Sequence, residues 1–98
     1  MIDQLSGSLQ RALERVPYHM HEGVAMYVLH GCPPGNFLRA VLENKLMEAG
    51  LRADPQNRVS LSGWVAVLEA MPMDIIGSPL AVSAHIEAKE REREAADV

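Results

Sequence analysis

Apolar side chains recur at spacings of three and four residues along most of the chain, and prolines and glycines separate the stretches in which they do so. At this period the side chains fall on a single face of an α-helix. Four stretches show the pattern clearly, and a fifth follows Pro79. No stretch of strand length alternates apolar and polar residues. The pattern predicts an all-α chain, a compact bundle of four to five short helices that forms one domain over residues 1–98.

The first two predicted helices have recognisable ends. Asp3 or Ser6 is placed to cap the first turn of the helix in residues 2–16. The next helix begins at Pro17, a residue suited to a first turn, and we expect Gly31 to close it in a left-handed conformation. The two apolar stripes consist of Ile2, Leu5, Leu9, Ala12, Leu13 and Val16, and of Met20, Val24, Tyr27 and Val28.

The third stretch predicts one helix over residues 36–49. Asn36 or Gly35 serves as its cap, and Gly50 is expected to end it in a left-handed conformation, with Leu51 folding back on the last turn. Its stripe comprises Phe37, Leu38, Val41, Leu42, Leu46 and Ala49.

Two further helices are expected in the second half of the chain. Asp54 followed by Pro55 reads as a cap and a first-turn proline for a helix that ends at Pro72. Gly63 lies inside it, at a propensity cost of up to about 1 kcal/mol, which is tolerable where another backbone passes close by. Ser78 and Pro79 open the last helix, whose charged end at residues 87–98 is prone to fraying.

Composition narrows the class of protein. The chain has 98 residues, of which 48% are hydrophobic and 22% charged, as in ordinary globular domains. Its net charge of −4 argues weakly against a nucleic-acid binder. No apolar run approaches the length of a membrane span, the start lacks the pattern of a secretory signal, and Cys32 has no internal partner for a disulfide. We therefore expect a cytoplasmic protein.

Charge is scarce between residues 59 and 86, where Glu69 and Asp74 are the only acidic residues and lysine and arginine are absent. Two explanations are open, and they are compatible. The helix here is the central one of the bundle, or part of it forms an exposed patch that binds a partner or a second copy of the chain. The candidate contact residues are Trp64, Val67, Met71, Met73, Ile75 and Ile76.

The residues with metal-binding or nucleophilic chemistry do not form a recognisable site. His19 and His21 are two apart, so on a helix they point to different sides. A zinc site needs three or four ligands, and nothing in the spacing brings His30 or Cys32 to them. The serines show no nucleophile elbow, and no glycine-rich phosphate loop is present. We expect no catalysis, no metal and no cofactor, with these histidines in capping or surface roles.

A weak basic cluster supports an alternative function. Arg39, Lys45, Arg52 and Arg58 are close in sequence around the third helix and its exit. Acidic residues interleave them, and few aromatic residues are available to stack on bases. The alternative is a small DNA-binding regulator that uses these four residues.

One stretch resembles a known group of proteins. It runs from Pro17-Tyr18-His19-Met20 through Pro33-Pro34-Gly35, Phe37-Leu38 and Ala40-Val41-Leu42 to Ala53-Asp54. Over about residues 17–58 it is similar to small phage and prophage proteins of unassigned activity. They tend to be aromatic near the end of the fourth helix, where this chain has Val67-Leu68-Glu69. The resemblance implies a phage-encoded accessory protein that binds a bacterial host or defence component, and it carries over no catalytic residue.

Overall fold

The computed structural model describes residues 1–96, and within them the regular structure is entirely helical. The α-helices are α1 (Gly7–Leu13), α2 (His21–His30), α3 (Asn36–Leu42), α4 (Leu46–Arg52), α5 (Pro55–Val59), α6 (Leu61–Glu69) and α7 (Pro79–Ala96). Three short 3₁₀ helices, η1 (Ile2–Gln4), η2 (Tyr18–Met20) and η3 (Met73–Ile75), join them. The all-α prediction is confirmed, although the helices are shorter and more numerous than the four to five expected.

Several predicted helix ends are confirmed by their hydrogen bonds. The Ser6 hydroxyl accepts from the Leu9 N–H at 3.2 Å, and the Asp54 carboxylate accepts from the Asn57 N–H at 2.7 Å. Gly31 ends α2 with φ at 64°, in the left-handed region. Ser78 caps the start of α7 through the Ala81 N–H. In each case the short polar side chain or the glycine satisfies backbone groups that the helix itself leaves unpaired.

The helix expected over residues 36–49 is divided in two, and the predicted stop at Gly50 is wrong. Asn44 takes the left-handed conformation, with φ at 65°. Its N–H donates to the Val41 carbonyl, and the Lys45 N–H donates to the Ala40 carbonyl, which together form a Schellman closure. Asparagine tolerates this conformation better than most residues with a side chain. Gly50 instead lies inside α4.

The helix expected between Pro55 and Met71 is also divided, at Ser60, into α5 and α6. Trp64 and Val67 on α6 are buried, and α6 packs against α1. The prediction for Gly63 is confirmed, because a Cβ on this residue would lie 2.1 Å from the carbonyl oxygen of Arg15. Only a glycine allows α6 to lie this close to the end of α1.

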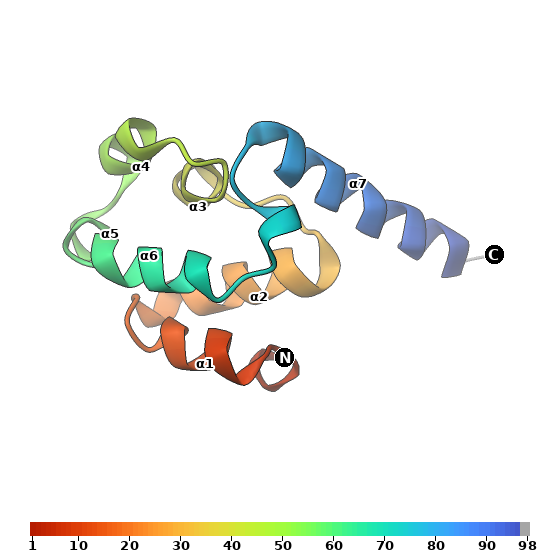
Figure 1. Cartoon of the computed structure of the whole chain (residues 1–98), viewed down its shortest axis with the longest axis horizontal. Coiled ribbons are helices and arrows are strands. Elements are labelled where there is room, and N and C mark those ends of the chain that lie inside the picture. Colours follow the sequence, from red (N-terminus) through yellow and green to blue (C-terminus); the bar gives the residue numbers. More distant parts are fainter. Residues whose placement is uncertain (97–98) are drawn as a thin grey trace.

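The buried apolar side chains form one cluster that draws on every α-helix except α5. Its largest fully buried members are Trp64, Tyr27, Leu9, Leu13 and Leu42. The molecule measures 45 × 27 × 21 Å, and Figure 1 shows α4 and α7 at opposite ends of its long axis.

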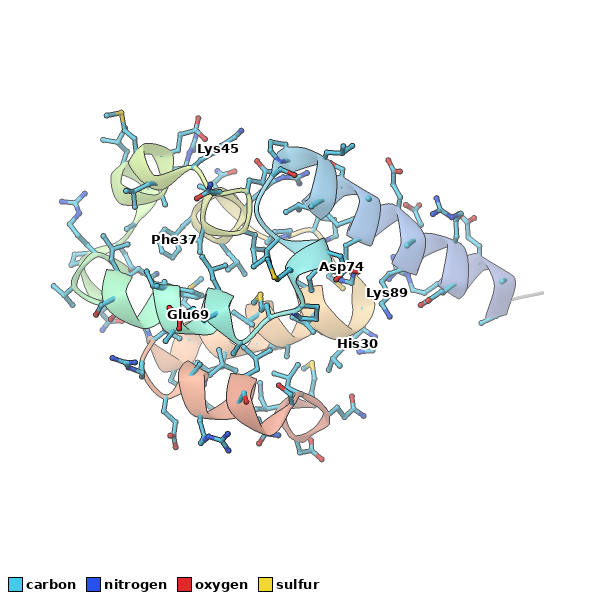
Figure 2. The ribbon with its side chains drawn as sticks, viewed as in Figure 1. His30, Phe37, Lys45, Glu69, Asp74 and Lys89 are labelled. Carbon is cyan, nitrogen blue, oxygen red and sulfur yellow. The ribbon has the colours of Figure 1, made fainter. Side chains whose placement is uncertain are left out.

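Helix α7 projects from the body, but its first turns are firmly attached to α2. The His85 Nε2 donates to the Tyr27 carbonyl at 2.7 Å, and the Tyr27 hydroxyl donates to the Ile75 carbonyl. Further along, Arg93 donates to the His30 carbonyl at the end of α2, near which Lys89 also lies (Figure 2). Cations are favourable at a helix C-terminus. The charged end continues as helix to Ala96, and the rest of the 87–98 segment lies outside the described residues.

Candidate docking surface

Four of the six predicted contact residues belong to the core. Trp64, Val67, Met71 and Ile75 are all less than 9% exposed. The Trp64 indole donates to the Asn57 side chain at 3.1 Å, and its ring meets that of Phe37 edge-on at 5.5 Å. Figure 2 shows Phe37 on α3. The scarcity of charge between residues 59 and 86 is explained in part by the burial of these four side chains in the core, whereas Val65 on the outer side of α6 is 54% exposed.

The other two residues of that set lie nearer the surface. Met73 is 88% exposed, and Ile76 is half-buried against the core. Neither neighbours another strongly exposed apolar residue within the η3 connection, where Pro72 and Asp74 flank Met73. In this fold the six residues do not form a continuous patch.

Helix α4 instead presents an apolar face to the solvent. Of its seven residues only Ala49 is buried. Leu46, Met47 and Leu51 are 75%, 80% and 76% exposed. At about 100° per residue these three side chains and Gly50 share one arc of the helix about 140° wide. An ordinary surface helix turns such a stripe inward, so α4 is reversed with respect to the core.

A cleft adjoins this arc, between α6 and the α3–α4 pair. Its volume is about 380 Å³, and most of its lining is apolar. Val65 on its rim is 54% exposed, and Leu61 and Leu68 are half-buried. Leu46 borders both the cleft and the exposed arc. We call the combined surface the α4–α6 apolar face, defined as Leu46, Met47, Leu51, Leu61, Val65 and Leu68.

The α4–α6 apolar face is not evident from the sequence, because the apolar pattern of residues 36–49 predicts one continuous helix. On a continuous helix Leu46 continues the buried stripe of α3, and Leu51 folds back on it. The left-handed conformation of Asn44 ends α3 and changes the direction of the chain. As a result, the Leu46 side chain is exposed to solvent. The available signal was Glu43-Asn44-Lys45, three polar residues between apolar runs with an asparagine at their centre.

The four predicted basic residues do not form a free basic patch. Arg39 and Lys45 both contact the carboxylate of Glu43, at 2.9 and 3.2 Å, and Glu43 is only 8% exposed. Burial disfavours the charge on Glu43, but the hydrogen bonds from Arg39 and Lys45 outweigh it and lower its pKa. Figure 2 labels Lys45 in the connection between α3 and α4. Two of the four positive charges are thus paired with Glu43.

The remaining two basic residues are exposed. Arg58 donates to the Gly50 carbonyl at 3.0 Å, and Arg52 makes no ion pair within residues 1–96. A duplex-binding surface neutralises several phosphates at once. Two arginines, with Glu48 and Asp54 close in sequence, offer little for that purpose.

The histidines and the cysteine take local positions. His19 Nε2 lies 3.1 Å from the Asp54 carboxylate, and His21 donates to the Val16 carbonyl at 3.1 Å. The Asn57 N–H, followed by the His19 ring, lowers the pKa of Asp54. Cys32 is half-buried in a separate cleft of about 450 Å³ that His19 and Asp54 also line. No group of three potential metal ligands converges in residues 1–96.

Comparison with known proteins gives no relative. No protein-family model matches the chain, and neither a curated protein nor a solved structure is found to be similar to it. Among the helices described up to Ala96, none has the length and apolar character needed to cross a membrane.

Proposed function

We propose that this protein is a non-catalytic binding protein that docks on another protein through the α4–α6 apolar face. The observation that carries the proposal is the reversed orientation of α4, which exposes Leu46, Met47 and Leu51 and buries only Ala49. A seven-residue helix has little stability of its own, and one buried alanine adds little more. Covering the exposed side would stabilise the helix and remove its apolar surface from water.

The cleft gives this surface the shape that a docking site needs. Interfaces place apolar or aromatic anchors in pockets that are shielded from water, with a polar rim around them. Here the pocket is the cleft beside Val65, and Lys45, Asn44 and Ser62 supply polar groups at its edge. As the partner we propose a bacterial host or defence protein, which is what a phage origin of the kind suggested by residues 17–58 would imply.

Capture from bacterial lysate with tagged protein at about 1 μM tests the proposal. Val65→Glu places a charge in the cleft, and Leu80→Glu places the same charge at an exposed apolar site on α7 that does not line the cleft. We expect a protein that is retained by the wild type and by Leu80→Glu and lost with Val65→Glu, while circular dichroism shows all three folded. Equal retention by both variants would contradict docking at this face.

The second candidate, a small DNA-binding regulator, rests on the exposure of Arg52 and Arg58. It predicts a mobility shift of duplex DNA that weakens steeply with salt. The shift would disappear when both arginines are changed to glutamate. A shift that is independent of both arginines, or none in low salt, removes this candidate.

A further inference from the structure

We propose that a second copy of this chain covers the α4–α6 apolar face in the free protein, as a two-fold symmetric dimer whose α4 helices cross at Gly50. This inference rests on the proposed function, because it assigns an occupant to the same face when no other partner is bound. It implies that self-association and partner binding exclude each other.

The first support is a glycine that the chain itself does not require. A Cβ added to Gly50 would have no atom within 4 Å of it, and its φ is not positive. Gly63 is the contrast, since the Arg15 carbonyl occupies the place of its Cβ. A glycine inside a helix costs roughly 0.5–1 kcal/mol relative to alanine, but it allows another backbone to approach closely. The space beside Gly50 is open to a helix of a second copy.

The second support is the position of Gly50 among the exposed side chains. It lies on the α4 arc between Leu46 and Met47, so a helix that crosses there also covers both of them. In a two-fold interface the same patch meets itself, and residues at the axis face their own copies. When the two α4 helices cross at Gly50, their backbones can come closest together, because glycine has no side chain to keep them apart.

The third support is that the face is self-complementary. Met47 and Leu51 protrude from α4, and a hollow, apolar cleft begins at Leu46 on the same arc. Its volume of about 380 Å³ is more than twice the ~150 Å³ that holds a benzene ring. Two aliphatic side chains of this size fit such a space. In the proposed dimer, the protruding side chains of each copy lie over the cleft of the other.

The charge distribution permits this contact. The whole chain carries −4, which opposes the meeting of two copies in general. Residues 44–69, however, contain three basic and three acidic side chains and are neutral. The dimer thus forms where like-charge repulsion between the copies is smallest.

The size of the face sets the expected strength. A standard interface buries about 800 Å² on each partner, and smaller ones are weak and transient. Six apolar residues around one short helix belong to the smaller class. We expect dissociation in the range of roughly 10 μM to 1 mM, so that a protein partner with a larger contact can displace the second copy.

Sedimentation equilibrium of the purified full chain tests the proposal. We expect the average mass to rise from one chain near 1 μM toward two chains near 1 mM. Gly50→Ala and Leu51→Glu should each weaken association at least about tenfold, while Leu80→Glu leaves it unchanged. Gly50→Ala should also keep or raise the melting temperature, which separates loss of contact from loss of folding.

Three outcomes would overturn the inference. The mass could stay at one chain up to about 1 mM, it could rise equally in wild type and Leu51→Glu, or Gly50→Ala could associate as strongly as wild type. The lysate capture is done at about 1 μM, where the chain is a monomer by this account. If the chain does not dimerise but a partner is captured in a Val65-dependent way, this inference alone is overturned. If the chain dimerises but no partner is captured, the proposed function alone is overturned.

Discussion

Alanine at Gly63 and at Gly50 should change stability in opposite directions, although both residues lie inside α-helices. At Gly63 the new Cβ would stand 2.1 Å from the Arg15 carbonyl oxygen, where ordinary contacts are 3.4 Å or more. The end of α1 would have to move by more than 1 Å. Leu13 and Val16 on either side of Arg15 are buried, so that movement loosens the core.

The magnitudes follow from general values. Overpacking of this kind costs about 1–3 kcal/mol, and the obstruction is backbone, which places Gly63→Ala near the upper end. Better helix propensity returns up to about 1 kcal/mol, which leaves a net loss of about 2 kcal/mol. For a domain of this size that loss lowers the melting temperature by roughly 8–16 °C. Gly50→Ala meets no obstruction and should gain about 0.5–1 kcal/mol.

Thermal and urea unfolding followed by circular dichroism measure both effects. The protein should be kept near 5 μM, because association would add concentration-dependent stability. An unchanged denaturant slope would show that the folded and unfolded states expose the same surface as in wild type. If Gly63→Ala melted as high as Gly50→Ala, the close approach of α6 to the end of α1 would be refuted.

Three further substitutions test individual hydrogen bonds and ion pairs. Tyr27→Phe leaves the buried Ile75 carbonyl without its donor and should lower the free energy of unfolding in urea by about 1–3 kcal/mol. An unchanged free energy of unfolding would show that this hydrogen bond does not stabilise the fold. Burial raises the pKa of Tyr27 to about 12 in the folded protein. The neutral side chain therefore contributes its full stabilisation below pH 10, the ordinary pKa of tyrosine. That stability is lost as the pH rises toward 12, and Tyr27→Phe should flatten the loss. Asp54→Ala removes the α5 cap and should cost about 1 kcal/mol, while Asp54→Asn keeps it, and equal melting of the two would count against the cap. Since the pKa of Glu43 is lowered in the folded state, its contribution is present above about pH 4.5 and is lost as the pH falls through the lowered value. Glu43→Gln should therefore unfold with a shallower acid dependence, and an identical acid profile would contradict the role of this network.

Local rules predicted the features that involve few residues. The Asp54-Pro55 and Ser78-Pro79 starts and the Gly31 end depend on the chemistry of one or two residues, and each was confirmed. The close approach at Gly63 could also be inferred, because an interior glycine in a helix is otherwise costly. These features needed no knowledge of the tertiary fold.

The features that the sequence did not predict depend on competition between alternatives. Asn44 and Gly50 are both able to adopt the left-handed conformation, and hydrogen bonds to Ala40 and Val41 form at the asparagine. That choice reverses α4 and creates the exposed face. Likewise, whether Trp64 and Val67 face a partner or the core is decided by where α1 and α3 pack. Periodicity shows an excess of apolar positions but not what covers them.

Methyl NMR of protein labelled at methionine tests the central claim most directly. Met47 on α4 and Met73 in η3 are 80% and 88% exposed. They are therefore matched probes, Met47 for the α4–α6 apolar face and Met73 for the contact surface that was predicted from the sequence. Between about 10 μM and 1 mM the Met47 methyl signal should shift progressively while the Met73 signal stays fixed. A Met47 signal that moves no more than that of Met73 would contradict the account.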